Sequence, residues 1–366
     1  MGAVIPVLYP ATERTFANNG LGGLPDAISI TITSKANRPE VPFLEMEYPV
    51  DGLHYSDLAV ERIIYATPQQ GKHPQPFVIE RITRPINGVV TVYARHVAAA
   101  LQKCVTHGSK TGTWAATAID LFLANMVPTS ERDKWSRQYP SDYEVSSNRT
   151  VTFSEPATMM DAIMGVEGSI LDRFGGEYEF DHWTINVQTR LGKDTGLEVR
   201  YGVNMSDMTA ETDTSELVTA VVPYWSGTIN DVDTAVVGDI CTSSNASSYA
   251  SIRCIPLDVT REFESVSTAP TKAQVTAKGQ SFIGSTTQKN VTMSLDVKYI
   301  PVTDEIGDRP INLFDTVKVT HPDLGVSDTA KVVEVQFNPY TEKNVQITIG
   351  RLKKTIVDTI ADIIKK

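Results

Sequence analysis

Phe77-Val-Ile-Glu-Arg-Ile82 precedes the pair Asn87-Gly88, and Val89-Val-Thr-Val-Tyr93 follows it. Both stretches are apolar, and asparagine and glycine adopt positive φ angles readily, so the pattern is typical of two antiparallel strands joined by a tight turn. Upstream, Ile28-Ser-Ile-Thr-Ile-Thr33 alternates apolar and polar side chains, as a half-buried strand does. We therefore predict that the first hundred residues are β-rich, with a short helix at about 96–102 and a second helix or insertion at 56–65.

Helical patterns begin in the middle of the chain. Thr113 is suited to the N-cap of a helix that ends near residue 126 and has apolar side chains on one face. Pro156 favours the first turn of a second helix, which Gly175-Gly176 would end. A hairpin that turns at 181–182 follows, so this part of the chain is predicted to be α+β.

The remaining sequence alternates strands with polar segments. Residues 217–222 have the pattern of a buried strand, 226–250 that of an exposed loop, and 270–282 that of a helix. Further strands are predicted at 291–299, 315–320, 329–337 and 345–349, the last three of them antiparallel. A closing helix over 351–366 carries an apolar stripe and is too short to be stable unless it packs against something. The stripe consists of Leu352, Ile356, Ile360, Ile363 and Ile364.

The composition excludes some classes of protein. The 366 residues include 33 basic and 44 acidic side chains, a formal net charge of −11, and the length predicts several domains. An excess of carboxylates repels nucleic acid, which argues against a protein that grips DNA but allows a conduit through which DNA slides. No stretch approaches about 18 consecutive apolar residues, so we expect no stable insertion into a membrane.

Each candidate for catalysis or phosphate binding has a simpler structural interpretation. Cys104 and His107 lack an identifiable partner group, and an odd number of cysteines favours buried reduced thiols over a disulfide framework. Gly108–Thr113 lacks the residue order of a phosphate-binding loop, and Asn19–Gly23 lacks the context of a dinucleotide-binding turn. Both stretches are predicted to be loops or turns.

Metal ligands and sugar-stacking side chains are no clearer. One acidic cluster lacks the central glycine and final glutamate of a calcium-binding loop, so we expect a solvated face there; it consists of Asn230, Asp231, Asp233 and Asp239. The six histidines are scattered. Tryptophans in this number are more often core or interface anchors than sugar platforms; they are Trp114, Trp135, Trp183 and Trp225. We therefore predict no catalytic, cofactor-binding or metal-binding residues, and no cofactor.

The order of several segments resembles the N-terminal hub region of siphophage tail-associated lysins, the prophage tail endopeptidase family, which is similar to the baseplate hub of contractile-tailed phages. The segments that carry the resemblance are spread over nearly the whole chain: Phe77–Leu101, Phe174–Met205, Ser215–Tyr224, Leu313–Val319 and Ala330–Val335, with Ile349-Gly350 before a helix.

The resemblance implies an α+β, β-rich multidomain fold with two tube-like β-barrels, two lateral α+β domains and a C-terminal helix. By that analogy, residues 1–103 form the first barrel, and 209–227 together with 306–350 form the second, discontinuous barrel. Residues 104–208 and 228–305 are the lateral domains, and 351–366 form the C-terminal helix.

The function that the resemblance implies is structural. Three copies would form a ring at the tail tip of a virion assembled in the bacterial host cytoplasm, and would close or extend the tail tube. The implied partners are the homotrimer, the distal tail protein hexamer, the tape measure protein and a downstream fibre or lysin, with DNA passing through the channel without specific binding. Cell-wall-degrading activity resides in domains that follow this region, so we expect no enzyme here. The alternatives are a tail-associated peptidoglycan hydrolase and a carbohydrate-binding receptor module.

Overall fold

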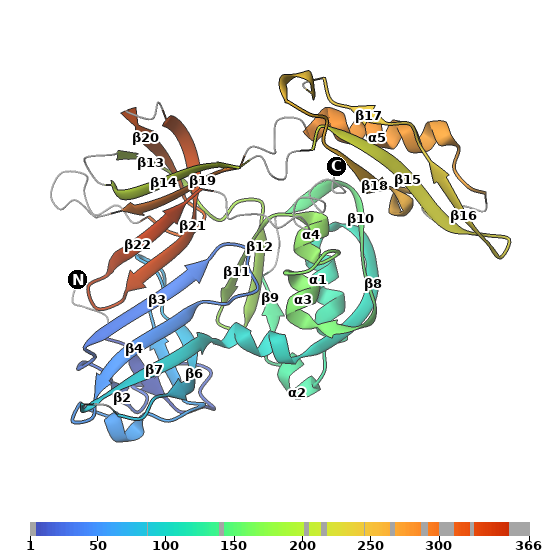
Figure 1. Ribbon diagram of the computed structural model, residues 1–366. Coiled ribbons are helices and arrows are strands. Elements are labelled where there is room, and N and C mark those ends of the chain that lie inside the picture. Colours follow the sequence, from blue (N-terminus) through green and yellow to red (C-terminus); the bar gives the residue numbers. More distant parts are fainter. Residues whose placement is uncertain are drawn as a thin grey trace. The chain divides into compact units, whose positions relative to one another are not determined.

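The computed structural model describes residues 5–85, 87–138, 143–200, 205–213, 218–244, 246–263, 268–286, 292–299, 311–322 and 326–350. The described chain is mostly β-structure with few helices, which confirms the predicted β-rich α+β class. It divides into two compact units (Figure 1). Unit 1 comprises Met1–Thr209 and Leu295–Leu352, and unit 2 comprises Ala210–Ser294 and Lys353–Lys366. No described helix is long and apolar enough to cross a membrane.

The N-terminal part of unit 1 consists of short strands around one apolar core. They are β1 (Val7–Tyr9), β2 (Gly22–Gly23), β3 (Ser29–Lys35), β4 (Phe43–Pro49), β5 (Ile63–Ala66), β6 (Gln75–Ile82) and β7 (Val89–His96), with a 3-10 turn η1 (Tyr55–Asp57) before β5. Alternate residues of β3 and β4 are buried, as the period-two pattern predicted. Asn87 and Gly88 turn between β6 and β7 with φ angles of 55° and 75°, which confirms the predicted hairpin. The helix or insertion predicted for 56–65 is only partly right, because the last residues of this range belong to β5.

Strands from the other end of unit 1 complete this sheet. They are β13 (Asp194–Arg200), β20 (Thr316–His321), β21 (Val326–Asn338) and β22 (Lys343–Ile349). β20, β21 and β22 pair antiparallel as predicted, and β21 also pairs antiparallel with β3. The 11 strands run in the order β13-β20-β21-β3-β4-β7-β6-β5-β1-β2, with β22 beside β21. The described strands form an open path between β13 and β2 rather than a closed barrel.

Two segments lie in other sheets than the resemblance implied. It grouped 209–227 with 306–350, but β15 (Ala220–Ile229) pairs with strands of unit 2. It placed β13 in the lateral domain, but β13 pairs parallel with β20. The reason is shared burial, because Leu197 and Val199 of β13 pack in one core with Val317 and Val319 of β20. Alternation of apolar and polar residues predicts that a segment is a strand, but it does not predict which strand it pairs with.

A lateral α+β part of unit 1 lies between these strands in sequence. It contains η2 (Val97–Lys103), β8 (Val105–Trp114), α1 (Ala115–Ala124), α2 (Thr129–Arg132), β9 (Ser136–Arg137), β10 (Glu144–Thr158), α3 (Met159–Ile163), α4 (Ile170–Phe174), β11 (Glu177–Asp181) and β12 (Thr184–Gln188). The helices α1, α3 and α4 pack on the curved pair β8 and β10, and side chains from the three helices and from β10 share one core (Figure 1). The hairpin β11–β12 and the helix end at Gly175 were predicted correctly.

Three local predictions in the lateral part are wrong. Trp114, not Thr113, precedes α1, because Thr113 belongs to β8. Gly108–Thr113 is likewise part of β8 and not a loop, since β10 pairs with it. Pro156 lies in β10 at a register shift, where a missing N–H is tolerated, and Thr158 caps α3 by accepting a hydrogen bond from the Asp161 N–H at 3.0 Å.

Unit 2 contains a four-stranded sheet with one helix on it. Its elements are β15, β16 (Val232–Val237), β17 (Cys241–Thr242), η3 (Ala246–Ser248), β18 (Cys254–Asp258), η4 (Thr260–Glu262) and α5 (Lys272–Thr286). The helix α5 confirms a prediction, whereas the exposed loop predicted for 226–250 is largely wrong, because β16 pairs with β15 along its length. The predicted strand at 291–299 is present as β19 (Thr292–Tyr299), which pairs with β14 (Met205–Asp213). The helix predicted for 351–366 lies outside the described residues.

Candidate functional site

The structure separates the pair that was weighed as a nucleophile. Cys104 is buried at the end of η2, and burial raises the pKa of its thiol, whereas His107 is exposed on β8. Successive residues of a strand point to opposite faces, so a spacing of three places the two side chains on different sides. Neither position has the surroundings of a reactive thiolate. Cys241 is also buried, but Cys254 is exposed, which corrects the expectation of buried thiols throughout.

The acidic cluster of unit 2 is distributed along a hairpin. Asn230 and Asp231 form the turn between β15 and β16, with φ angles of 50° and 63°. Asp233 accepts a hydrogen bond from the Thr228 hydroxyl, and Asp239 forms an ion pair with Lys272 at 2.6 Å. In the part of the chain that the structure describes, no group of three or more His, Cys, Asp or Glu side chains could hold a metal ion.

The tryptophans have different surroundings. Trp135 and Trp225 are buried in the cores of the lateral part and of unit 2. Trp183 is partly buried beside Phe16, and the Arg14 guanidinium lies 4.8 Å from its ring centroid. Trp114 is 37% exposed.

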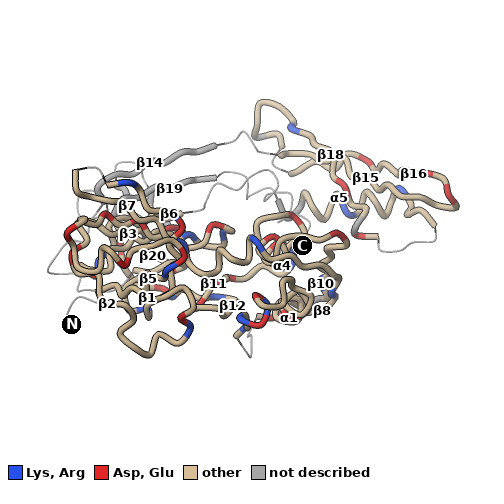
Figure 2. The backbone as a smooth tube through the Cα atoms, turned by 90° about the horizontal axis from the view of Figure 1, so that it is seen from below, with Lys and Arg blue, Asp and Glu red and all other residues tan. Residues whose placement is uncertain are grey.

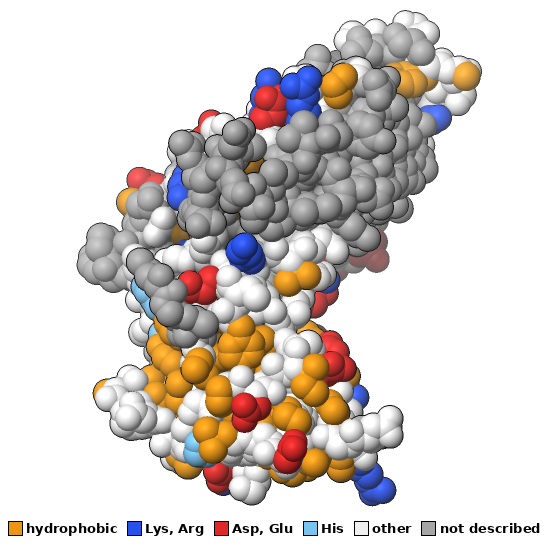
Figure 3. All heavy atoms as spheres, turned by 90° about the vertical axis from the view of Figure 1, so that its left-hand side faces the viewer, with side chains coloured by type: hydrophobic (Ala, Val, Ile, Leu, Met, Phe, Trp, Pro, Cys, Tyr) orange, Lys and Arg blue, Asp and Glu red, His pale blue; other side chains and the backbone are white. Residues whose placement is uncertain are grey.

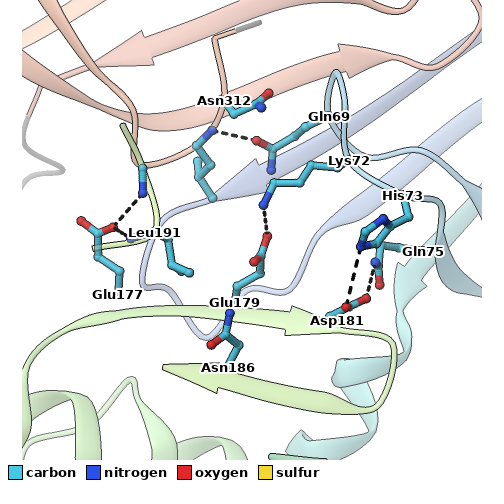
Figure 4. A network of polar contacts seen from close by, with 12 residues as sticks. Gln69, Lys72, His73, Gln75, Glu177, Glu179, Asp181, Asn186, Leu191 and Asn312 are labelled. Carbon is cyan, nitrogen blue, oxygen red and sulfur yellow. Dashed lines mark hydrogen bonds and ion pairs between the residues drawn. The ribbon is translucent and has the colours of Figure 1, made fainter. Parts of the chain in front are cut away.

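A polar network of unit 1 lies where three segments meet around a cavity of about 290 Å³. The segments are residues 69–75, the hairpin β11–β12 and residues 311–315 (Figure 4). We call this region the junction. It joins the N-terminal strands, the lateral part and the last strands, and its contacts therefore decide how these parts of unit 1 are held together.

Polar side chains of the hairpin β11–β12 bind the N-terminal part at the junction. Lys72 pairs with Glu179 at 2.8 Å, and the Gln75 amide donates to Asp181 Oδ1 at 2.7 Å (Figure 4). The His182 N–H donates to Gln75 Oε1, also at 2.7 Å. Burial opposes ionisation of Asp181, but hydrogen bonds from Gln75 and His182 outweigh it and lower the pKa of the carboxyl. Gln75 therefore hydrogen-bonds both to the side chain of Asp181 and to the backbone of His182.

His96 lies behind Gln75 at the end of β7. Its Nε2 lies 3.2 Å from Gln75 Oε1, and its Nδ1 accepts a hydrogen bond from the Ala98 N–H. The ring is almost completely buried, and burial, reinforced by the charge of His182, lowers its pKa to about 3. His96 is therefore a neutral structural histidine that positions Gln75 and caps η2.

Glu177 connects the lateral part to the last strands. This buried carboxylate accepts hydrogen bonds from the Leu191 N–H at 2.6 Å and from the Gly192 N–H at 3.3 Å, and it pairs with Lys331 of β21. A second connection joins residues 311–315 to the N-terminal part, because the Leu313 N–H donates to Gln69 Oε1 at 2.7 Å. These contacts tie together segments that are far apart in sequence.

An aromatic contact extends the junction toward the N-terminus. Phe16 stacks on Tyr65 with ring centroids 4.2 Å apart, and on Trp183 at 6.2 Å. The Tyr65 hydroxyl lies 3.0 Å from His182 Nε2. The junction therefore combines ion pairs, amide hydrogen bonds and stacked rings, an arrangement suited to holding domains in fixed register rather than to moving protons.

Sequence reasoning did not identify the junction. Asp181 and His182 were recognised only as a turn, and Gln75 and Glu177 were not singled out. Their partners lie about a hundred or more positions away, and a glutamine or glutamate has no local pattern that reveals a distant partner.

A second feature of unit 1 is an apolar surface on its N-terminal part. Hydrophobic side chains gather over the strands of the lower half of Figure 3. Five apolar residues of the N-terminal part are exposed, namely Ile5 (42%), Ile28 (60%), Val50 (36%), Leu53 (56%) and Val60 (56%). The Leu53 N–H donates to Asp26, and Ile5 lies beside Gly23. We call the first four of these residues the apolar surface; exposed apolar side chains of this kind are candidates for burial in an interface.

Charged side chains are mixed over unit 1. Acidic and basic residues are interspersed along its described backbone and do not gather in a basic stripe (Figure 2). This distribution agrees with the net charge of −11 in disfavouring a DNA-gripping surface.

Comparisons with known proteins confirm the family resemblance. Residues 193–360 match the family model described as prophage endopeptidase tail. Prophage tail protein gp18 from Listeria monocytogenes EGD-e is similar in fold, at 17% identity and a TM-score of 0.58, over 98% of this chain and 97% of that one. The tail protein from Neisseria meningitidis MC58 is 12% identical with a TM-score of 0.58, over 99% of both chains. The 43 kDa tail protein of prophage MuSo2 from Shewanella oneidensis is 10% identical with a TM-score of 0.57, over 88% and 93%. No curated protein matches the chain.

Proposed function

We propose that the chain is a structural subunit of a phage or prophage tail tip, a hub that trimerises to close or extend the tail tube. In this role it anchors the tip to the distal tail protein, the tape measure protein reaches its lumen, and a downstream fibre or lysin attaches to it. The β-rich parts of unit 1 supply the wall of the tube. DNA passes without specific binding, and the chain catalyses no reaction.

One observation carries the proposal: a single sheet unites strands from both ends of unit 1 through the β3–β21 pairing. A ring of identical subunits closes only if each subunit presents its two contact surfaces at a constant angle. Backbone hydrogen bonds between β3 and β21 supply that constancy, and Glu177 and Gln75 hold the lateral part in place at the junction. The fold shared with prophage tail proteins supports the same interpretation.

The apolar surface is the part of unit 1 best suited to contact a symmetry mate. Burying side chains such as Ile28 and Leu53 removes apolar area from water, at about 25 cal/mol per Å².

The test is reconstitution with tail-tip partners. The chain is mixed with the distal tail protein and examined by electron microscopy and light scattering, and we expect a threefold ring on a sixfold partner. The double variant Ile28→Glu/Leu53→Glu should lose the ring while its circular dichroism is unchanged. Val166→Glu, at an apolar residue of the lateral part that is 39% exposed, is the matched control. A chain that stays monomeric in the presence of its partners would contradict the hub role.

A digestion assay separates this role from the hydrolase alternative. Purified chain is incubated with peptidoglycan, and we expect no turnover. Turnover that disappears in Cys104→Ala or His107→Ala would overturn the proposal in favour of an enzyme. Binding to glycans on intact host cells, without binding to the distal tail protein, would instead favour a receptor module.

A further inference from the structure

The hairpin β15–β16 of unit 2 extends past the rest of its sheet as a two-stranded ribbon. Among the described strands, β17 pairs with β15 only at Ala220 and Val221, and β18 pairs with it only along 220–224. Beyond that point β15 pairs with β16 alone, as far as the turn at Asn230 and Asp231 (Figure 1). A two-stranded ribbon is only marginally stable in water by itself, so this one gains stability from a further strand.

β16 is the edge strand of this sheet. Its turn has two residues, so Ile229 and Val232 form a hydrogen-bonded pair, and hydrogen-bonded and open pairs alternate from there. The N–H and C=O groups of Asp233, Ala235 and Val237 therefore point away from β15. Within the described ranges of the chain, no strand pairs with this side of β16. The edge thus presents a row of backbone hydrogen-bonding groups to solvent.

The edge lacks the features that usually prevent further pairing. Edge strands are commonly protected by lysine, by proline or by a bulge. β16 reads Val-Asp-Thr-Ala-Val-Val, with neither residue, and it pairs with β15 without a register shift. Val232 is 62% exposed and Val237 is 54% exposed. The strand is therefore suited to accept another strand beside it.

Charge and side-chain pattern define the strand that fits. Residues 226–238 contain Asp231 and Asp233 and no lysine or arginine. Side chains of Asp233, Ala235 and Val237 lie on one face, which is polar near the turn and apolar at its far end. A fitting strand carries a basic residue opposite Asp233 and an apolar residue opposite Val237. The same edge of a second copy has no basic residue to meet Asp233, which favours a different protein as the partner.

We propose that β16 binds an extended segment of another tail-tip protein, with alternating basic and apolar side chains, by strand addition. This inference rests on the proposed function, which supplies the partner proteins. Backbone hydrogen bonds to Asp233, Ala235 and Val237 provide affinity, and the charge of Asp233 together with the apolar end of the strand provides specificity. Binding also stabilises the ribbon, because β15 and β16 become part of a three-stranded region.

Hydrogen exchange, read amide by amide by mass spectrometry, tests the proposal. In the isolated chain, we expect the outward amides of Asp233, Ala235 and Val237 to exchange faster than the alternate amides of β16, which bond to β15. The chain is then assembled with the distal tail protein, the tape measure protein and the downstream fibre or lysin. In that assembly the outward amides should exchange roughly tenfold more slowly or better protected still.

Ala235→Pro is the variant that blocks the edge. It removes one outward N–H and leaves the hydrogen bonds to β15 in place, because proline is tolerated on the free side of an edge strand. We expect it to abolish the protection and to weaken binding of the strand-donating partner by roughly tenfold. Ala235→Ser keeps the N–H and is the matched control, which should behave like the unaltered chain.

Three results would overturn the proposal. The first is slow exchange of the outward amides in the dilute isolated chain, because the edge would then be covered already. The second is protection that appears as the concentration of the chain alone rises, which would identify a second copy as the occupant. The third is a threefold ring in which these amides still exchange fast; that result would leave the hub role intact. Absence of any ring would instead contradict the hub role, and with it the source of the added strand.

Discussion

The outward faces of β4 in unit 1 and β15 in unit 2 differ in character. β4 buries Leu44 and Met46 and turns Glu45 and Glu47 to solvent, with the same alternation that the sequence shows. β15 buries Val221 and Trp225 under α5 but places Val222 and Tyr224 on its second face.

The difference concerns how the outer face of each strand interacts with solvent. Charged side chains on the outer face of β4 are already solvated, so this strand needs no further layer there. Exposure of apolar side chains on the outer face of β15 to water is unfavourable, and their burial would lower the free energy of the folded protein. Among the described residues, the outer face of β4 is therefore more polar than the second face of β15.

The largest expected effect comes from the same truncation in the two cores. Phe77 of unit 1 is fully buried, and Phe282 of unit 2 is 7% exposed. We expect Phe77→Ala to cost close to 5 kcal/mol and Phe282→Ala about 3 kcal/mol, because the partly exposed Phe282 loses less buried apolar contact. Hydrogen exchange read separately for the amides of each unit measures both losses. Equal losses would show that the two cores are equally closed.

Glu177 tests how much the junction contributes to unit 1. Glu177→Ala leaves the Leu191 and Gly192 N–H groups without their acceptor, at a cost of about 2 kcal/mol. The matched variant Glu179→Ala removes only a half-exposed ion pair with Lys72 and should cost about 0.5 kcal/mol. Denaturant unfolding of unit 1 compares the two variants. A larger loss of unfolding free energy for Glu179→Ala than for Glu177→Ala would show that Glu177 is not the main connection at the junction.

Acid should weaken unit 1 more than unit 2. The pKa of His96 is lowered to about 3 in the folded chain, against about 6.5 for an ordinary histidine. Between these values the unfolded chain binds a proton that the folded chain does not, so stability falls as the pH drops from about 6.5 toward 3. At pH 5 the loss is roughly 2 kcal/mol relative to pH 7. Residues 210–294 contain no histidine.

His96→Gln is the control for this prediction. The amide can keep a contact with Gln75 but cannot titrate, so the difference in unit 1 stability between pH 7 and pH 5 should largely disappear. The lowered pKa of Asp181 does not interfere, because its contribution is lost only below the ordinary carboxyl pKa near 4. An unchanged pH dependence in His96→Gln would assign the effect to other groups.

The smallest effects concern two similar turns. Asn87-Gly88 and Asn230-Asp231 both join their strands with two consecutive positive φ angles. Gly88→Ala should cost about 1 kcal/mol, since the added Cβ would meet only Val50 Cγ2 at an ordinary contact distance of 3.9 Å and backbone strain is the only cost. Asp231→Gly should stabilise unit 2 by about 0.5 kcal/mol for the same reason. Thermal unfolding of both variants measures the two changes in stability. Changes of the same sign would contradict the common turn type.

Local patterns account for the correct part of the fold prediction. The strands at β3, β6, β7 and β20–β22 and the helix α5 follow from alternation, turn residues and periodicity, all of which lie within a short window of sequence. The errors share one cause. Pro156 and the glycines of Gly108–Thr113 disfavour a strand, yet pairing of β8 with β10 overrides that preference. Residues 226–250 are polar because β16 is exposed, not because it is irregular.

The candidate site was beyond local patterns. Gln75, His96 and Asp181 each have an ordinary sequence context, and their common property is position in space. The family resemblance was confirmed for residues 193–360, but it misplaced β15, because segments of a discontinuous domain are assigned by contacts that a linear comparison does not contain.

The β-rich class, the hairpins and the acidic balance that disfavours DNA binding can be predicted from the sequence, because each depends on neighbouring residues or on composition. The pairing of β21 with β3, the pairing of β13 with β20, and the connections that Glu177 and Gln75 make between three segments follow from the folded chain alone. Side-chain alternation indicates that a strand has a buried face. Which strand pairs with it depends on the apolar surfaces and hydrogen-bonding groups that come together when the whole chain folds.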